Sequence, residues 1–151
     1  MIGLDVGEVR IGVAASDGLG LTAQGLPTII RKSANDDYDQ VIKVIEERQA
    51  KRLIVGLPKN MDGSHGPQEE KVRAFADALM ERIDERGYAK PELIFWDERL
   101  STVAANKTLI NADVSRGKRK AVVDKLAAVL ILQGFLDREY SKKKAKEREN
   151  D

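Results

Sequence analysis

Hydrophobic and polar positions alternate in two different periods along this chain, and the first part of the pattern predicts strands. Residues 1–6 are apolar apart from Asp5, which is typical of a buried strand that ends at an acid. Residues 10–16 follow after a tight turn and predict the second strand of a hairpin. Residues 21–30 can form a third strand, in which Pro27 is best tolerated at a sheet edge.

Apolar positions spaced by three and four residues then predict helices that alternate with two further strands. The first helix begins after the N-cap Ser33 and ends near Ala50, and a strand follows at 52–57. The second helix passes through Val72 and Ile83 and ends at Gly87, and a strand follows at 93–96. Two further helices are predicted, one near 101–110 and a last one at 119–140. We therefore predict an α/β fold with a five-stranded mixed sheet and helices on both faces. Strands one to three are antiparallel, and strands four and five run parallel to strand one.

Length and composition narrow the class of protein. The 151 residues suit one domain, which we place at 1–138, and the charged residues 139–151 are expected to be disordered. The absence of cysteine excludes disulfides and thiolate metal sites. Neither a membrane span nor a signal peptide is apparent, so a cytoplasmic location is expected. The net charge of +1 says little about partners, but the clusters Lys118–Lys120 and Lys142–Lys144 could neutralise phosphates.

Three acids occupy positions where a carboxylate is hard to explain by structure alone. Asp5 lies in an apolar strand, and Glu98 follows the fifth strand with Asp97 beside it. Asp124 begins a helical stripe that otherwise faces the core. Acids at strand ends of α/β sheets commonly point into the functional crevice. Each acid also has a purely structural alternative, namely a turn cap, an ion pair with Arg99 or a place near a helix N-terminus.

If these carboxylates meet, they require a cation. Burying an unpaired carboxylate costs several kcal/mol, and three together repel one another. Hard oxygen ligands without cysteine favour Mg²⁺ or Mn²⁺ over zinc. Two such ions about 4 Å apart could activate water and stabilise the leaving oxygen of a phosphodiester. Spacing along the chain cannot show that the acids converge.

Four segments, in order, resemble the motif blocks of the YqgF/RuvX family. They are Asp5–Ala14, Val55–Ser64, Asp97–Thr102 and the last helix from Arg119 to Gln133. The resemblance implies a ribonuclease H-like fold and a metal-dependent nuclease that matures the 5′ end of precursor 16S ribosomal RNA. It also implies that Asp5, Glu98 and Asp124 are the catalytic and metal-binding acids. Asp97 is the weaker candidate, because adjacent strand residues face opposite ways.

Other functions stay open at this point. The same active site could resolve branched DNA, acting as a homodimer that matches a two-fold junction, whereas a monomer would argue against junction cleavage. A non-catalytic RNA-binding assembly factor is a third possibility. An ATPase of the actin and sugar-kinase type would need two such lobes, and the chain has the length of only one.

Several basic and aromatic side chains could support such a site. The candidates for phosphate contacts are Arg10, Lys59, Arg99, Lys118, Arg119 and Lys120, with surface solubility as the alternative for each. His65 could serve as a base or a phosphate contact, but an exposed loop histidine without a catalytic role is favoured. Trp96 is expected to pack in the core and not to stack on a base.

Overall fold

The computed structural model describes residues 1–60, 62–100 and 116–150, with the side chains of 116–123 excepted. The helix predicted near 101–110 and the loop after it therefore lie outside the described residues. So do the side chains of Lys118, Arg119 and Lys120.

The described strands form one five-stranded sheet. They are β1 (Ile2–Val6), β2 (Arg10–Ser16), β3 (Ala23–Ile30), β4 (Arg52–Leu57) and β5 (Glu92–Asp97). Their order in the sheet is β3-β2-β1-β4-β5. The pairs β1–β2 and β2–β3 are antiparallel, whereas β4 runs parallel to β1 and β5 parallel to β4. The predicted mixed sheet is confirmed, and Pro27 lies on the edge strand β3, where its missing N–H is tolerated.

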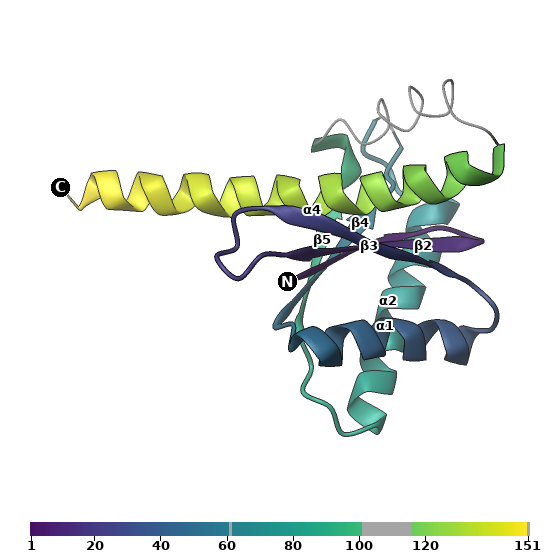
Figure 1. Cartoon of the computed structure of the whole chain (residues 1–151). Coiled ribbons are helices and arrows are strands. Elements are labelled where there is room, and N and C mark those ends of the chain that lie inside the picture. The colour runs from purple at the N-terminus through teal and green to yellow at the C-terminus, as the bar shows by residue number, and fades with distance from the viewer. Residues whose placement is uncertain (61, 101–115, 151) are drawn as a thin grey trace.

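Helices cover both faces of this sheet (Figure 1). On one face, α1 (Ala34–Arg48) and α2 (Pro67–Glu85) pack on alternate strand residues such as Ile2, Leu4 and Leu53. On the other face, α4 (Arg116–Glu149) packs on the intervening positions. Two apolar cores result, one on each side of the sheet, as expected for a sheet whose central strands are buried on both faces.

Local signals in the sequence determine where the first two helices begin and end. The Ser33 side chain caps α1 by accepting a hydrogen bond of 3.3 Å from the backbone N–H of Asp36. Pro67 stands at the start of α2, where its missing N–H costs nothing. After α2, Gly87 adopts a φ of +74°, the left-handed conformation that ends many helices.

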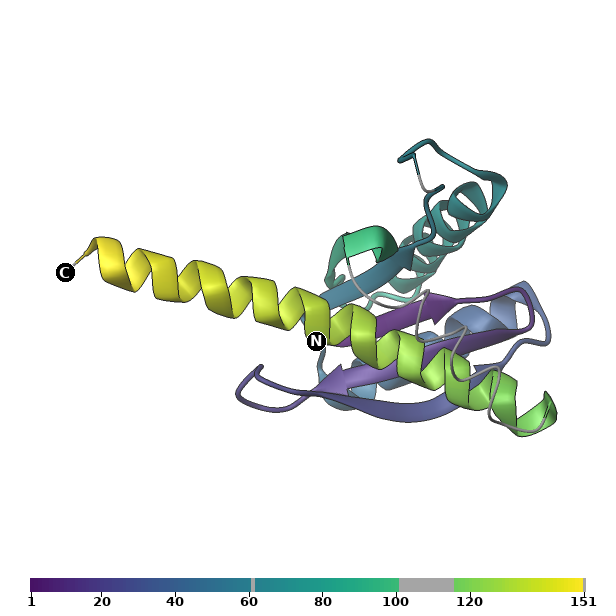
Figure 2. The ribbon, with the colours of Figure 1, turned by 90° about the horizontal axis from the view of Figure 1, so that it is seen from above.

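The last helix is longer than the sequence pattern indicated. It runs from Arg116 to Glu149, whereas we expected disorder from residue 139 onward. Residues 139–149 lack an apolar face but are rich in good helix formers. Ion pairs between successive turns join Lys142 to Glu139 at 3.9 Å and Lys144 to Glu147 at 3.6 Å. As Figure 2 shows, this end of α4 projects beyond the sheet. None of the described helices is long and apolar enough to cross a membrane.

Candidate active site

The three acids singled out in the sequence line one cavity of about 220 Å³. Asp5 comes from β1, Glu98 from the short helix η1 (Glu98–Leu100) that follows β5, and Asp124 from α4. The rest of the wall is formed by Val6, Gly7, Gly56, Pro58, Gln68 and Val72. The cavity lies where β1 and β4 end, so the parallel strands deliver their carboxyl ends to one place.

Strand register explains why the acids gather around Asp5. Asp5 pairs with Gly12 of β2, and paired residues of adjacent strands point to the same face. A Cβ atom on Gly12 would stand 1.9 Å from the carbonyl oxygen of Asp124, so α4 crosses directly over this position. On the other side, a Cβ atom on Gly56 would stand 2.9 Å from Oε1 of Glu98. The two glycines flank Asp5 and leave the space that the other acids occupy.

Burial differs among the three acids. Asp5 is 6% exposed, whereas Glu98 and Asp124 are half-buried. The prediction that Asp124 begins a core-facing stripe is confirmed, because Ala128, Ile131 and Phe135 are buried on the same side of α4. Asp5 is thus fixed by strand pairing on the central strand, and the other two carboxylates have access to the cavity mouth.

Asp97 faces a different environment from Glu98. Its guanidinium partner is Arg99, whose side chain donates hydrogen bonds of 2.7 and 3.1 Å to the carboxylate. These bonds hold the pKa of Asp97 below its ordinary value, although burial alone would raise it. The charge of Lys59 also lowers this pKa. The ion pair expected for Arg99 therefore forms with Asp97, and the cavity is lined by Glu98.

A second carboxylate, which the sequence did not single out, lies buried beside the cavity. Glu69, in the first turn of α2, is 1% exposed and accepts a hydrogen bond from Nδ1 of His65. Its Oε1 accepts no hydrogen bond from the described residues, but it lies 3.7 Å from Nζ of Lys59 and 3.6 Å from the guanidinium of Arg73. Lys59 and His65 thus connect the loop after β4 to Glu69 of α2, and Arg73 contacts Glu69 from the same helix.

The charge of Glu69 is maintained by these neighbours. Burial raises the pKa of the Glu69 carboxyl, but the His65 hydrogen bond and the charges of His65, Lys59 and Arg73 outweigh it. The net pKa is below the ordinary value of 4.5. A carboxyl with a lowered pKa in the folded state stabilises the fold above its unfolded pKa, and that contribution is lost as pH falls through the folded value.

We expect Glu69→Gln to lower the melting temperature at neutral pH, because Lys59 and Arg73 would then face a neutral buried amide. The difference between wild type and variant should shrink as pH falls below the unfolded pKa near 4.5. Thermal unfolding followed by circular dichroism measures both effects. Glu70→Gln is the matched control, since Glu70 is exposed in the same turn. Equal losses in the two variants would contradict a special role for Glu69.

The remaining predicted site residues are dispersed. Arg10 is half-buried at the start of β2, and it does not line the cavity. Lys59 follows the cavity residue Pro58, with its side chain 21% exposed. The side chain of His65 is 67% exposed, in keeping with a loop histidine, although it contacts Glu69. Trp96 is 4% exposed, which confirms its place in the core.

Sequence reasoning missed two groups of residues at this site. Gly12 and Gly56 carry no chemistry, and only the packing of α4 and η1 reveals why a side chain is excluded there. Gln68 and Glu69 lie in the first turn of α2, where polar and acidic residues are common and do not indicate a site. The available signal was the spacing of Glu69 and Arg73, which are four residues apart and therefore lie on one face of α2. His65 lies in the loop before this helix, four residues ahead of Glu69.

The donor chemistry of the cavity suits a hard divalent cation. Carboxylate oxygens are the ligands that Mg²⁺ and Mn²⁺ prefer. The volume of about 220 Å³ also has room for several waters, at about 30 Å³ each. Among residues 1–60, 62–100 and the described part of α4, no three acidic or histidine side chains are already arranged to hold one ion.

The strand order, the helices on both faces and the acids at the strand ends define a protein of the ribonuclease H-like class. The solved structure of Thermus thermophilus RuvC in complex with a Holliday junction substrate has the same fold, with a TM-score of 0.55. The two chains are 14% identical, and the match covers 92% of this chain and 96% of RuvC.

The chain belongs to the RuvX family, described as Holliday junction resolvase, whose model matches residues 1–138. A relative from Halalkalibacterium halodurans is 51% identical over 143 residues, which are 93% of this chain and 98% of the relative. One from Desulforamulus reducens is 54% identical over 137 residues, or 91% and 96% of the two chains. Both carry the name "Putative pre-16S rRNA nuclease". Membership of this family of resolvase-like nucleases supports hydrolysis of phosphodiester bonds as the activity.

Proposed function

We propose that this protein is a nuclease dependent on Mg²⁺ or Mn²⁺ that processes the 5′ end of precursor 16S ribosomal RNA. The observation that carries the proposal is the cavity at the strand ends, where carboxylates from β1, η1 and α4 line one wall. Three separate elements position these acids, and carboxylates that share a cavity repel one another, which favours binding of a cation. The names of the relatives favour ribosomal RNA as the substrate.

Asp5, Glu98 and Asp124 are the residues that would hold the cation. A bound divalent cation would offset their charge, acidify the attacking water and stabilise the leaving oxygen. In the reaction, the water oxygen bonds to phosphorus and one phosphorus–oxygen bond to the sugar breaks. One of the cavity carboxylates would accept the proton that the attacking water loses, and the leaving oxygen would gain a proton from solvent.

Basic side chains beside the cavity would position the phosphate backbone. Lys59 follows the cavity wall at Pro58, and Arg99 directly follows Glu98. Contacts of this kind fix a strand relative to the acids without reading its sequence. Arg10, Lys118, Arg119 and Lys120 are proposed as further contacts of the same type.

Cleavage of branched DNA is the second candidate. It is favoured by the description of the matched family model as a Holliday junction resolvase. The two candidates use the same carboxylates, and they differ in the substrate that reaches them. Substrate choice is therefore a question for direct assay.

We expect labelled precursor 16S RNA to be cleaved in the presence of Mg²⁺ and to remain intact when the ion is chelated. A four-way DNA junction should be assayed in parallel under the same conditions. Melting curves should also shift upward with Mg²⁺, because an ion that binds the folded state stabilises it. Cleavage of the junction alone would assign the second candidate. Absence of both cleavage and a thermal shift would contradict a metal-dependent nuclease and favour a binding role in ribosome assembly.

A further inference from the structure

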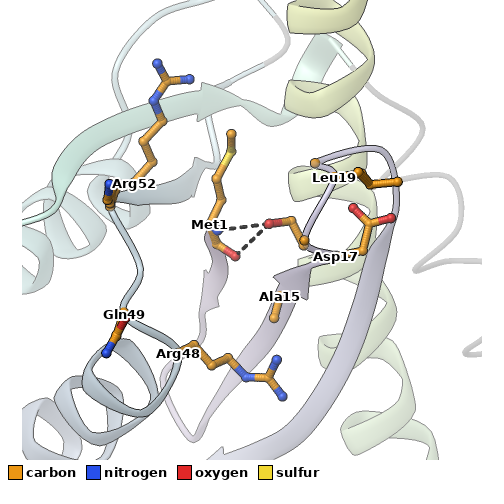
Figure 3. Close-up of a pocket in the computed structure, with 11 residues that line it drawn as sticks. Met1, Ala15, Asp17, Leu19, Arg48, Gln49 and Arg52 are labelled. Carbon is orange, nitrogen blue, oxygen red and sulfur yellow. Dashed lines mark hydrogen bonds between the residues drawn. The ribbon is translucent and has the colours of Figure 1, made fainter.

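Two further cavities lie at the opposite end of the central strands from the three acids, where β1 and β4 begin. One cavity of about 620 Å³ is bounded by Met1, the turn after β2 and the connection from α1 to β4. Figure 3 shows Arg48 at the end of α1 and Arg52 at the start of β4 around it. A neighbouring cavity of about 620 Å³ extends to the C-terminal part of α4. The two adjoin at Met1, Leu19, Gly20 and Arg52, and together we call them the distal groove.

The distal groove is separated from the acids by the length of the central strand. Met1 precedes β1, and Asp5 lies near its end. At about 3.3 Å per residue, the two positions are about 13 Å apart. The distal groove therefore lies at the opposite end of β1 from the carboxylates.

Cations dominate the walls of the distal groove. They are Arg48, Lys51 and Arg52 in the first cavity and Lys142, Lys143 and Lys146 in the second. The acids are Asp17, Glu139 and Glu149. Asp17 is engaged locally, because it accepts hydrogen bonds of 2.8 Å from the backbone N–H of Leu21 and 3.0 Å from the hydroxyl of Thr22. Glu139 faces Arg52 at 3.9 Å and Lys142 at 3.9 Å.

Four of these cations keep their charge available. Arg48, Lys51, Lys143 and Lys146 are exposed, and none of them forms an ion pair with another described residue. Lys71, by contrast, is paired with Glu8 at 2.9 Å. The distal groove thus carries an excess of positive charge that the described residues do not neutralise.

The α-amino group of Met1 responds to this local charge. Its pKa is lowered, first by burial and then by the positive charges of Arg48 and Arg52. Arg48 and Arg52 place positive charge at the first cavity, and positive charge attracts anions and raises their local concentration.

Apolar residues stand at the rim of the same groove. Leu19 is 82% exposed and Tyr140 is 51% exposed. Exposed apolar residues also occur at protein interfaces, so a protein partner is the competing occupant. The excess of positive charge favours a polyanion, and an exposed tyrosine beside lysines suits stacking on an unpaired base.

We propose that the distal groove binds the sugar–phosphate backbone of the nucleic-acid substrate away from the bond that is cleaved. This inference rests on the proposed nuclease function, and it adds a second contact region to the substrate. The chemistry recognised is a run of phosphates, held by Lys and Arg side chains from α1, β4 and α4.

The test is a salt titration of binding in the presence of a chelator, so that no cleavage occurs. The probes are labelled precursor 16S RNA and a labelled four-way DNA junction. The test variant is Lys51→Gln/Lys143→Gln/Lys146→Gln, and the matched control is Lys32→Gln/Lys43→Gln/Lys90→Gln, which neutralises three exposed lysines elsewhere. Melting temperatures of all proteins establish that they are folded.

We expect the test variant to bind the probes more weakly than wild type. Its plot of log binding constant against log salt concentration should be less steep by about 0.7–0.9 for each phosphate that the variant no longer neutralises. The control should keep the wild-type slope. Equal slopes for wild type and the test variant would overturn the distal groove while leaving the nuclease proposal intact. Failure of wild type to bind either probe would overturn it as well, and a protein partner would then be the remaining occupant. Binding without cleavage when Mg²⁺ is restored would count against the nuclease proposal alone.

Discussion

Asp5→Asn is expected to reduce cleavage of the preferred substrate by roughly 10⁴-fold or more, on the order of removing one member of a catalytic set. Asp5 lies on the central strand, is 6% exposed, and shares its cavity with Glu98 and Asp124. The amide retains the size of the side chain but loses the charge that would hold a cation. The melting temperature without Mg²⁺ should stay the same or rise, because the repulsion among the acids falls. Single-turnover cleavage and thermal unfolding measure the two effects.

Neighbouring acids provide the internal comparison for this prediction. Glu98→Gln should cause a loss similar to that of Asp5→Asn, since Glu98 lines the cavity. Asp97→Asn should cause a smaller loss, because the Asp97 carboxylate is bound to Arg99. Full activity in Asp5→Asn, or a larger loss in Asp97→Asn than in Glu98→Gln, would contradict the assignment of the three acids.

Gly12→Ala is expected to damage both the fold and the activity, although it adds only one methyl group. The new Cβ would lie 1.9 Å from the carbonyl oxygen of Asp124 and 2.5 Å from its carbonyl carbon. Backbone atoms cannot rotate away, so α4 must move and carry Asp124 with it. Overpacking of this kind costs about 1–3 kcal/mol. A displacement of about 1 Å at a catalytic group can lower the rate by about 10²-fold.

Gly18→Ala is the matched control for this substitution. A Cβ atom on Gly18 would meet no atom within 4 Å. The added methyl group should therefore leave the melting temperature the same or slightly higher. Urea unfolding of both variants compares their stability, and a cleavage assay of Gly12→Ala measures the loss of activity. Wild-type stability and activity in Gly12→Ala would show that α4 does not rest on β2 as described.

Much of the fold was predictable because local rules decide it. The alternation of apolar residues indicated the strands, the hairpin indicated their antiparallel pairing, and the Ser33 cap indicated the start of α1. The missing apolar face of residues 139–151 favours disorder. Helix propensity and ion pairs between turns oppose it, and α4 continues to Glu149.

Some residues of the candidate site can likewise be predicted from the sequence, and others cannot. A carboxylate is recognisable when it interrupts an apolar pattern, so Asp5, Glu98 and Asp124 stand out in the sequence. Glu69 does not, because an acid in the first turn of a helix is ordinary by every local rule. Its burial among Lys59, His65 and Arg73 depends on how the loop after β4 meets α2.

The elements, the mixed sheet and the acids that are costly to bury can all be predicted from the order of residues. The shared cavity of the acids, the ion pair of Asp97 with Arg99 and the cations at the other end of the central strand appear only in the folded chain. Element formation depends on residues a few positions apart. Convergence instead depends on strand order and on the path of α4, which brings residue 124 onto residue 12.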